Sequence, residues 1–135
     1  MTRTRAGFIP LSYPAGPGFA TGAAEDWRMA RILISEPHPD VRVLLEAVVR
    51  RAGHEPVGRG ELTSDETPEL MILEPASAEG LAAAAKLRRR FEDLPIICAS
   101  IEPPTLATKA LEPAAYLLKP FRLGELESAI AAALI

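Results

Sequence analysis

Four short runs of mostly apolar residues constrain the fold of this chain more than any other feature of its sequence. They cover residues 31–34, 70–73, 96–99 and 115–118, and segments with helical periodicity lie between them. Strands that helices cover on both faces need continuous apolar sequence, because neither face reaches water. Alternation of such runs with helices is typical of a parallel sheet joined by crossover helices. The sequence therefore predicts an α/β domain.

A fifth, weaker strand is expected at residues 55–58. Pro56 confines this strand to an edge of the sheet, because proline has no N–H to donate to an interior ladder. The clearest helix follows Pro39 and ends before Gly53, a proline and a glycine placed as helix boundaries favour. Three helices are expected from stripes of apolar residues at helical spacing: Val41, Leu44, Leu45, Val48 and Val49; Leu81, Ala84, Leu87 and Phe91; Leu123, Leu126, Ile130 and Leu134. Residues 61–67 and 105–111 carry few large apolar side chains, so one or two helical turns or a loop are expected there.

The chain has 135 residues, which is enough for one domain with one core. Residues 1–28 are rich in proline and glycine and predict a disordered tail or a misassigned start, followed by a folded domain at 29–135. The formal net charge of −3 gives no basic field, so nucleic acid is not the expected partner. A single cysteine, Cys98, excludes an internal disulfide, and no apolar stretch approaches the ~20 residues that span a bilayer. We expect a cytoplasmic protein.

Polar residues follow the predicted strands at the points where they end. Glu36 and Pro37 follow the first run, Glu74 follows the second, Ser100 follows the third and Lys119 follows the fourth. Ligand sites in doubly wound parallel sheets form beyond the carboxyl ends of the strands, so these side chains are expected at one edge. Two carboxylates beside a lysine and a hydroxyl suit either a fixed ion pair or phosphoryl-transfer chemistry.

Residues 31–134 resemble the receiver domain of bacterial two-component response regulators. The resemblance is carried by Ile32-Leu33-Ile34 before an acidic loop, by Pro39-Asp40-Val41-Arg42, by Arg51-Ala52-Gly53-His54-Glu55, by Leu94-Pro95-Ile96-Ile97 with Ser100, and by Ala115-Tyr116-Leu117-Leu118-Lys119-Pro120-Phe121. It implies a three-layer, doubly wound, flavodoxin-like fold with five parallel strands in the order 2-1-3-4-5. Compared with such receiver domains, the second and fourth helices of this chain are expected to be shortened. A cis peptide between Lys119 and Pro120 is also implied.

The same resemblance assigns expected roles to individual positions. Lys119 matches the lysine that senses the phosphoryl group, Ser100 the hydroxyl that binds it, and Tyr116 the aromatic residue whose rotamer reports activation. Glu74 falls on the phospho-accepting aspartate. Glu36 and Pro37 fall on the two aspartates of the acidic loop.

Two of these positions depart from the pattern in ways that impair the chemistry. Pro37 offers no metal ligand, and Glu74 carries its carboxylate one methylene further out than an aspartate does. Mg²⁺ demands near-ideal oxygen geometry, so Glu36 and Glu74 are at most weak ligands, and no cofactor is otherwise expected. The longer side chain places the Glu74 carboxylate within reach of Lys119. A Glu74–Lys119 pair that imitates the phosphorylated state is therefore one hypothesis.

Three functional interpretations remain open at this point: a permanent mimic of the phosphorylated state, a binding module without phosphate chemistry, and residual phosphoacceptance at Glu74. A small-ligand or nucleotide enzyme of the same fold is the alternative from another class, but no glycine-rich loop follows the first strand. We expect a stand-alone, non-enzymatic signalling module, since the sequence ends at Ile135, directly after the last helix. By resemblance, its protein partner, which is a kinase, an output protein or a second copy, contacts the segment from Thr105 to Leu111, Tyr116, and the segment from Arg122 to Leu134.

Overall fold

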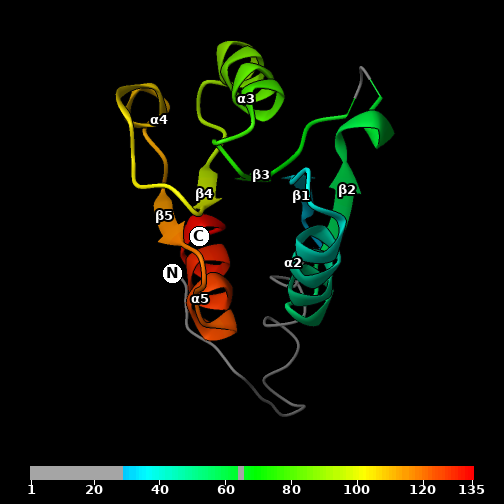
Figure 1. Ribbon diagram of the computed structural model, residues 1–135. Coiled ribbons are helices and arrows are strands. Elements are labelled where there is room, and N and C mark those ends of the chain that lie inside the picture. Colours follow the sequence, from blue (N-terminus) through cyan, green and yellow to red (C-terminus); the bar gives the residue numbers. More distant parts are fainter. Residues whose placement is uncertain (1–28, 64–65) are drawn as a thin grey trace. The chain divides into compact units, whose positions relative to one another are not determined.

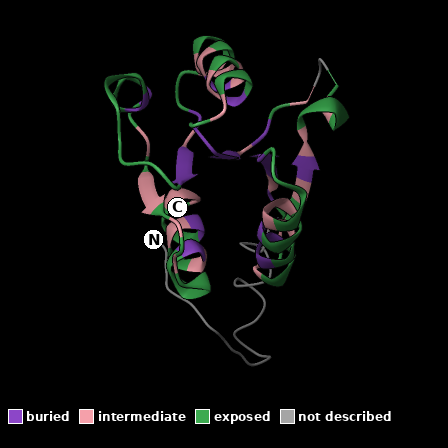
Figure 2. Cartoon of the chain, in the orientation of Figure 1, coloured by how far each residue is buried: buried purple, intermediate pink, exposed green. Residues whose placement is uncertain are grey.

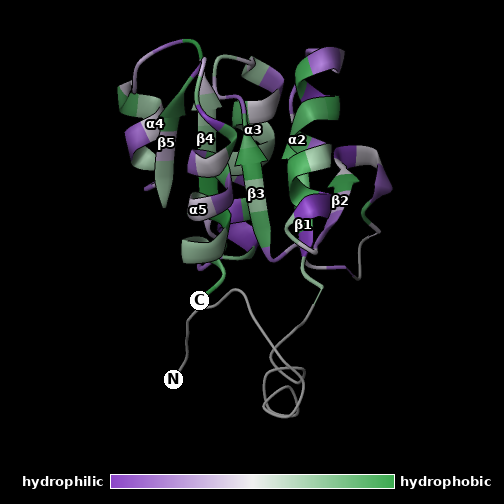
Figure 3. Cartoon of the chain, turned by 90° about the horizontal axis from the view of Figure 1, so that it is seen from below, coloured by the Kyte–Doolittle hydropathy of each residue, from purple (hydrophilic) through white to green (hydrophobic). Residues whose placement is uncertain are grey.

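The computed structural model describes residues 29–63 and 66–135, so the expected tail at residues 1–28 lies outside the described part. Five parallel strands form one sheet in the order β2-β1-β3-β4-β5 (Figure 3). The strands are β1 (Arg31–Ser35), β2 (Glu55–Gly58), β3 (Leu70–Leu73), β4 (Ile96–Ser100) and β5 (Ala115–Leu118). The predicted parallel sheet, its order and the edge position of β2 are confirmed.

Helices cover both faces of the sheet, which gives three layers (Figure 1). Helices α2 (Pro39–Arg51) and α5 (Leu123–Ala133) pack on one face, and α3 (Ala78–Arg90) and α4 (Leu106–Ala110) lie on the other. The boundaries of α2 follow local chemistry. Pro39 opens the helix, and Gly53, just beyond it, adopts a φ of 92°, which glycine tolerates without steric cost.

Alternate residues of each strand face two apolar cores, one on each face of the sheet, rather than the single core expected from the length of the chain. Ile32 and Ile34 point to the core under α2 and α5, whereas Leu33 points to the core under α3. The two clusters are continuous with the inner faces of the helices, while the outer helix faces are exposed (Figure 2). This burial on both faces explains why the strands are apolar without alternation.

The connections expected to be short are short. Only a three-residue 3₁₀ helix, η1 (Arg59–Glu61), lies among the described residues between β2 and β3, and α4 has five residues. Leu62 is the one large apolar residue that the segment after η1 packs against the core. A full amphipathic helix needs a wider apolar stripe than one side chain provides.

Two strands extend one residue further than the apolar runs predict. Ser35 and Ser100 are both buried and still pair within the sheet, with Leu73 and Leu118 respectively. Prediction from apolar runs ends a strand at the first polar residue, but ladder hydrogen bonds continue until the chains diverge. The expected cis peptide between Lys119 and Pro120 is present. None of the described helices is both long and apolar enough to cross a bilayer.

Candidate functional site

The register of the sheet brings the polar residues of three loops together. Ser35 pairs with Leu73, so the residues that follow them, Glu36 and Glu74, lie side by side beyond the strand ends. The backbone N–H of Glu74 donates to the carbonyl oxygen of Ser35 at 3.0 Å, which fixes the two loops to each other. The N–H of Lys119 donates to the carbonyl oxygen of Ser100 at 2.8 Å and anchors the third loop.

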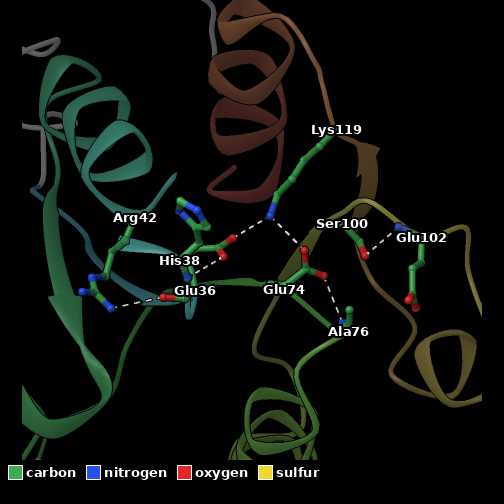
Figure 4. Close-up of polar contacts among 8 residues, drawn as sticks. All are labelled: Glu36, His38, Arg42, Glu74, Ala76, Ser100, Glu102 and Lys119. Atoms are coloured by element: carbon green, nitrogen blue, oxygen red, sulfur yellow. Dashed lines mark hydrogen bonds and ion pairs between the residues drawn. The ribbon is translucent and has the colours of Figure 1, made fainter. Parts of the chain in front are cut away.

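Lys119 bridges the two carboxylates (Figure 4). Its Nζ lies 2.7 Å from Oε1 of Glu36 and 2.8 Å from Oε1 of Glu74. The side chains of Glu36, Glu74 and Lys119 are only 3%, 7% and 15% exposed. We call these three residues the ion triad. Two carboxylates and one ammonium give it a formal charge of −1, so it is not electrically neutral.

Backbone N–H groups satisfy the carboxylate oxygens that face away from Lys119. Oε2 of Glu74 accepts the N–H of Ala76 at 3.0 Å, and Oε2 of Glu36 accepts the N–H of His38 at 3.1 Å. Both bonds are formed within the turn that follows the strand, so each loop orients its own carboxylate. A buried charge is stable only when its hydrogen-bonding groups are satisfied in this way.

The surroundings of Glu74 and Lys119 favour the ionised forms of these two residues. Burial on its own raises the pKa of Glu74, but hydrogen bonds from Lys119, Ala76 and Ser100 outweigh burial and leave this pKa below its usual value. Burial on its own lowers the pKa of Lys119, and the hydrogen bonds to Glu36 and Glu74 outweigh it, so that the pKa is raised. Both shifts mean that the folded protein holds the charges more firmly than the unfolded chain does.

Ser100 and Tyr116, the two other expected switch residues, both contact Glu102. The Ser100 hydroxyl is buried and accepts the N–H of Glu102 at 3.1 Å, and it contributes to lowering the pKa of Glu74. The Tyr116 hydroxyl donates to the carbonyl oxygen of Glu102 at 2.6 Å. Glu102 thus receives contacts from both expected switch residues, in the loop that follows β4.

The residues at the acidic loop fit Mg²⁺ poorly. Pro37 contributes no oxygen ligand from its side chain, and each of the two nearby carboxylates already binds an ammonium and a backbone N–H. Among residues 29–63 and 66–135, no group of three or more His, Cys, Asp and Glu side chains is placed to hold a metal ion. The donor set therefore disagrees with a magnesium site of the kind that the resemblance implies.

Sequence reasoning missed part of this arrangement. It paired Lys119 with Glu74, whereas the structure shows that Glu36 binds the same ammonium at the shorter distance. Arg88, near the end of α3, is a second residue of this kind, because its guanidinium reaches inward and donates to the carbonyl oxygens of Leu94 and Leu111. Its position on the helix face of Ala84, four residues earlier, was a signal that this arginine points toward the core.

Comparison with solved structures places the fold among bacterial signalling proteins. The chemotaxis protein CheY4 of Vibrio cholerae superimposes with a TM-score of 0.69 at 18% identity, covering 79% of this chain and 100% of that one. The response regulator TrrA of Thermotoga maritima, solved with Mg²⁺ and BeF, gives 0.66 at 24% identity, with 78% and 100% covered. A sensor protein from Polaromonas sp. JS666 gives 0.64 at 22% identity, with 79% and 97% covered.

No family model and no curated protein gives a significant match to the chain. The structural matches nevertheless extend over nearly the full length of their partners and agree with the strand order β2-β1-β3-β4-β5. The chain therefore has the flavodoxin-like fold of response-regulator receiver domains.

Proposed function

We propose that this chain is a receiver-like signalling module of a two-component system that acts through protein–protein contacts and does not take up phosphate. The observation that carries the proposal is the ion triad. A receiver that accepts phosphate needs an unblocked carboxylate, a divalent cation and a lysine available for the incoming charge. Here the lysine is already paired with both carboxylates.

Burial makes the triad a feature of the folded state rather than a surface contact. Exposed ion pairs contribute ~0–1 kcal/mol and exchange with water, whereas separating a buried pair leaves an uncompensated charge. Phosphorylation of Glu74 would require its carboxylate to leave Lys119 and the N–H of Ala76 before it could attack. These contacts support a domain held in one state, which is also what the permanent mimic requires.

The proposed partner face lies on α4, β5 and α5. Leu106 on α4 is 85% exposed and Leu118 on β5 is 51% exposed, and Leu123 at the start of α5 is also exposed. Tyr116 lies on the same edge strand, and its hydroxyl is bound at the surface to Glu102. Apolar side chains gathered on one edge are typical of a protein-binding surface.

The experiment that tests the proposal is incubation of the full chain with acetyl phosphate and Mg²⁺, followed by intact-mass spectrometry. We expect no phosphorylated species for the wild type. The double variant Glu74→Asp/Pro37→Asp restores the shorter acceptor and an acidic-loop carboxylate, and we expect it to gain one phosphoryl group. Glu92→Asp, an exposed position in the loop after α3, is the matched control for a glutamate-to-aspartate change.

Phosphorylation of the wild type would overturn the proposal in favour of Glu74 as a working acceptor. If the double variant also stays unmodified while remaining folded, then more than these two positions separates the chain from a phosphate-accepting receiver. The partner face is tested separately by Leu106→Glu/Leu118→Glu. This variant should keep the thermal unfolding midpoint and lose any concentration-dependent self-association seen by sedimentation velocity.

A further inference from the structure

One arginine joins α3 to α4, the two helices on the same face of the sheet (Figure 1). Arg88 lies in the last turn of α3, and its guanidinium donates to two carbonyl oxygens that are far apart in the sequence. Nη2 donates to Leu94 at 2.8 Å, in the segment before β4, and Nη1 donates to Leu111, the C-cap residue of α4. The guanidinium therefore binds the end of α4 and the segment before β4 at the same time.

Helix α4 is too short to be stable without contacts to the rest of the domain. It has five residues, whereas isolated helices shorter than ~12–15 residues are marginal in water. Of these five residues only Thr108 is buried, and Leu106 is 85% exposed. Leu111, directly after the helix, packs in the core under α3. The apolar core thus holds this segment through very few side chains.

The other hydrogen bonds of residues 105–112 stay within that segment. The hydroxyl of Thr105 accepts the N–H of Thr108 at 3.2 Å, and the hydroxyl of Thr108 accepts the N–H of Thr105 at 2.7 Å. At the other end, the N–H of Leu111 donates to the carbonyl oxygen of Thr108 at 3.1 Å. Within the described part of the chain, the hydrogen bond from Arg88 is the one that joins this segment to another helix.

The two carbonyl oxygens account for the orientation of Arg88. Neither of them belongs to α3, so satisfying the carboxyl end of its own helix does not explain the contacts. A guanidinium is a planar fork that binds two acceptors in one fixed arrangement, and a charged donor makes hydrogen bonds about twice as strong as a neutral one. Nε of Arg88 is buried and has no hydrogen-bond partner among the described residues. An unpaired buried donor is unfavourable, so the remaining contacts of the guanidinium must stabilise this position.

Helix α3 can hold α4 because it is itself firmly attached to the sheet. It has 13 residues, and the hydroxyl of its N-cap residue, Ser77, accepts the N–H of Gly80 at 3.1 Å. Ala84 is buried in the core on that face, and Leu81 and Leu87 pack against the same core. Helix α3 therefore does not depend on α4 for its position.

From these contacts we infer that Arg88 is the positioning residue that holds α4 against α3. Without its guanidinium, α4 opens while the sheet and the longer helices stay folded. The inference rests on the proposed function in one respect, because Leu106 on α4 belongs to the proposed partner face. Loss of the Arg88 contacts therefore also removes Leu106 from its place on that face.

The test compares the wild type with Arg88→Met and Arg88→Lys, each as the ¹⁵N-labelled full chain. Methionine keeps a long, unbranched side chain but has no donor, whereas lysine keeps the charge without the planar fork. Arg89→Met is the matched control, because Arg89 is exposed at the next position of the same helix. Thermal unfolding and amide spectra first establish that each variant is folded.

Two measurements on the free chain report whether α4 is held in place. The first is the protection of the amides of residues 109–112 against hydrogen exchange, with the amides of β3 as the internal reference. In Arg88→Met we expect this protection to fall about tenfold or more, toward that of an unfolded peptide, while β3 stays protected. The second is the ¹⁵N order parameter of residues 106–111, which should fall from about 0.85 to below about 0.6. Arg88→Lys should give intermediate values, and Arg89→Met should match the wild type.

Three results would overturn the inference. The first is an α4 that is as protected and as rigid in Arg88→Met as in the wild type. The second is loss of protection in β3 together with α4, which would mean that Arg88 supports the whole domain. The third is an equal loss of order in Arg89→Met. If Arg88→Met does not fold, Arg88→Lys decides by the same three criteria.

These measurements need no partner, so they separate the role of Arg88 from the proposed partner face. If α4 opens in Arg88→Met but Leu106→Glu/Leu118→Glu leaves self-association unchanged, the partner face is wrong and the role of Arg88 stands. If α4 stays in place while Leu106→Glu/Leu118→Glu abolishes self-association, the partner face stands and the inference on Arg88 is wrong.

Discussion

Nζ of Lys119 lies 2.8 Å from Oε1 of Glu74, and the two residues follow the carboxyl ends of β5 and β3, the strands on either side of β4. Glu36 binds the same ammonium from β1, so one lysine connects loops that are 83 and 45 residues away in sequence. The ammonium thus lies between the two carboxylates and joins the three loops. The stability of this edge of the sheet therefore depends on the three side chains of the ion triad.

Removal of the ammonium should destabilise the fold strongly. In Lys119→Met two buried carboxylates face each other without a cation, and we expect the free energy of unfolding to fall by about 3 kcal/mol or more. The measurement is urea unfolding at pH 7. Lys109→Met, at an exposed position of α4, is the matched control and should change stability by less than ~0.5 kcal/mol.

The stability lost in Lys119→Met should be partly regained when the two carboxylates that are left without a cation are also neutralised. The triple variant Glu36→Gln/Glu74→Gln/Lys119→Met has no buried charge at the site, and we expect it to be more stable than Lys119→Met alone. If both variants unfold at the same urea concentration, repulsion between the two carboxylates is not the cause of the loss.

Low pH should decrease the stability of the folded protein, because Glu74 becomes protonated. The pKa of this carboxyl is below its usual value of 4.5 in the folded protein, so the unfolded chain takes up the proton first as the pH falls. The stabilisation is fully present above pH 4.5 and is lost as the pH decreases through the folded pKa. Unfolding midpoints measured from pH 7 to pH 3 should fall less steeply for Glu74→Gln than for the wild type, whereas Glu92→Gln should follow the wild type.

His54 should make the stability of the folded protein depend on pH in a second, higher range. Its Nδ1 accepts the backbone N–H of Ala30 at 3.0 Å, and burial, opposed by the charge of Glu69, lowers the pKa of His54 below 6.5. Between this lowered pKa and 6.5 the unfolded chain binds the proton and the folded protein does not. Stability therefore declines as the pH falls below 6.5 and levels off below the folded pKa.

His54→Asn keeps an acceptor near the position of Nδ1 but does not titrate, so its stability should be constant over that range. His38→Asn, at an exposed loop position, is the control and should retain the decline seen in the wild type. A proton NMR titration of the two histidines checks the assignment directly. A pKa of His54 at or above 6.5 would contradict the prediction.

The sheet was predictable because strands that are buried on both faces consist almost entirely of apolar residues, and such runs can be recognised in the sequence. Runs such as Leu70–Leu73 have no polar residue, and burial on both faces is the environment that allows this. The strand ends at Ser35 and Ser100 were missed because their burial depends on pairing with β3 and β5, which composition does not encode. The shortened helices were predictable from the scarcity of apolar side chains after β2 and before β5.

For the candidate site, the sequence predicted which residues lie near one another but not all of the contacts between them. Topology implied that Glu36, Glu74 and Lys119 share an edge, and the longer side chain of Glu74 implied contact with Lys119. The second contact, from Glu36, depends on the register of β1 against β3, which places Ser35 opposite Leu73.

Two glycines in helices should respond in opposite directions to the same substitution. A Cβ at Gly80, in the first turn of α3, would lie 3.0 Å from Cδ1 of Leu73 and from Oγ of Ser35, and 3.3 Å from the carbonyl oxygen of Glu74. A Cβ at Gly124, in the first turn of α5, would meet nothing within 4 Å. Gly80→Ala should therefore lower the free energy of unfolding by about 1–3 kcal/mol through overpacking. Gly124→Ala should raise it by up to ~1 kcal/mol, because alanine is the better helix former. The signs of the two changes in the urea midpoint test this prediction. A stabilised Gly80→Ala would contradict it, because α3 would then shift away from β1 and β3 without cost.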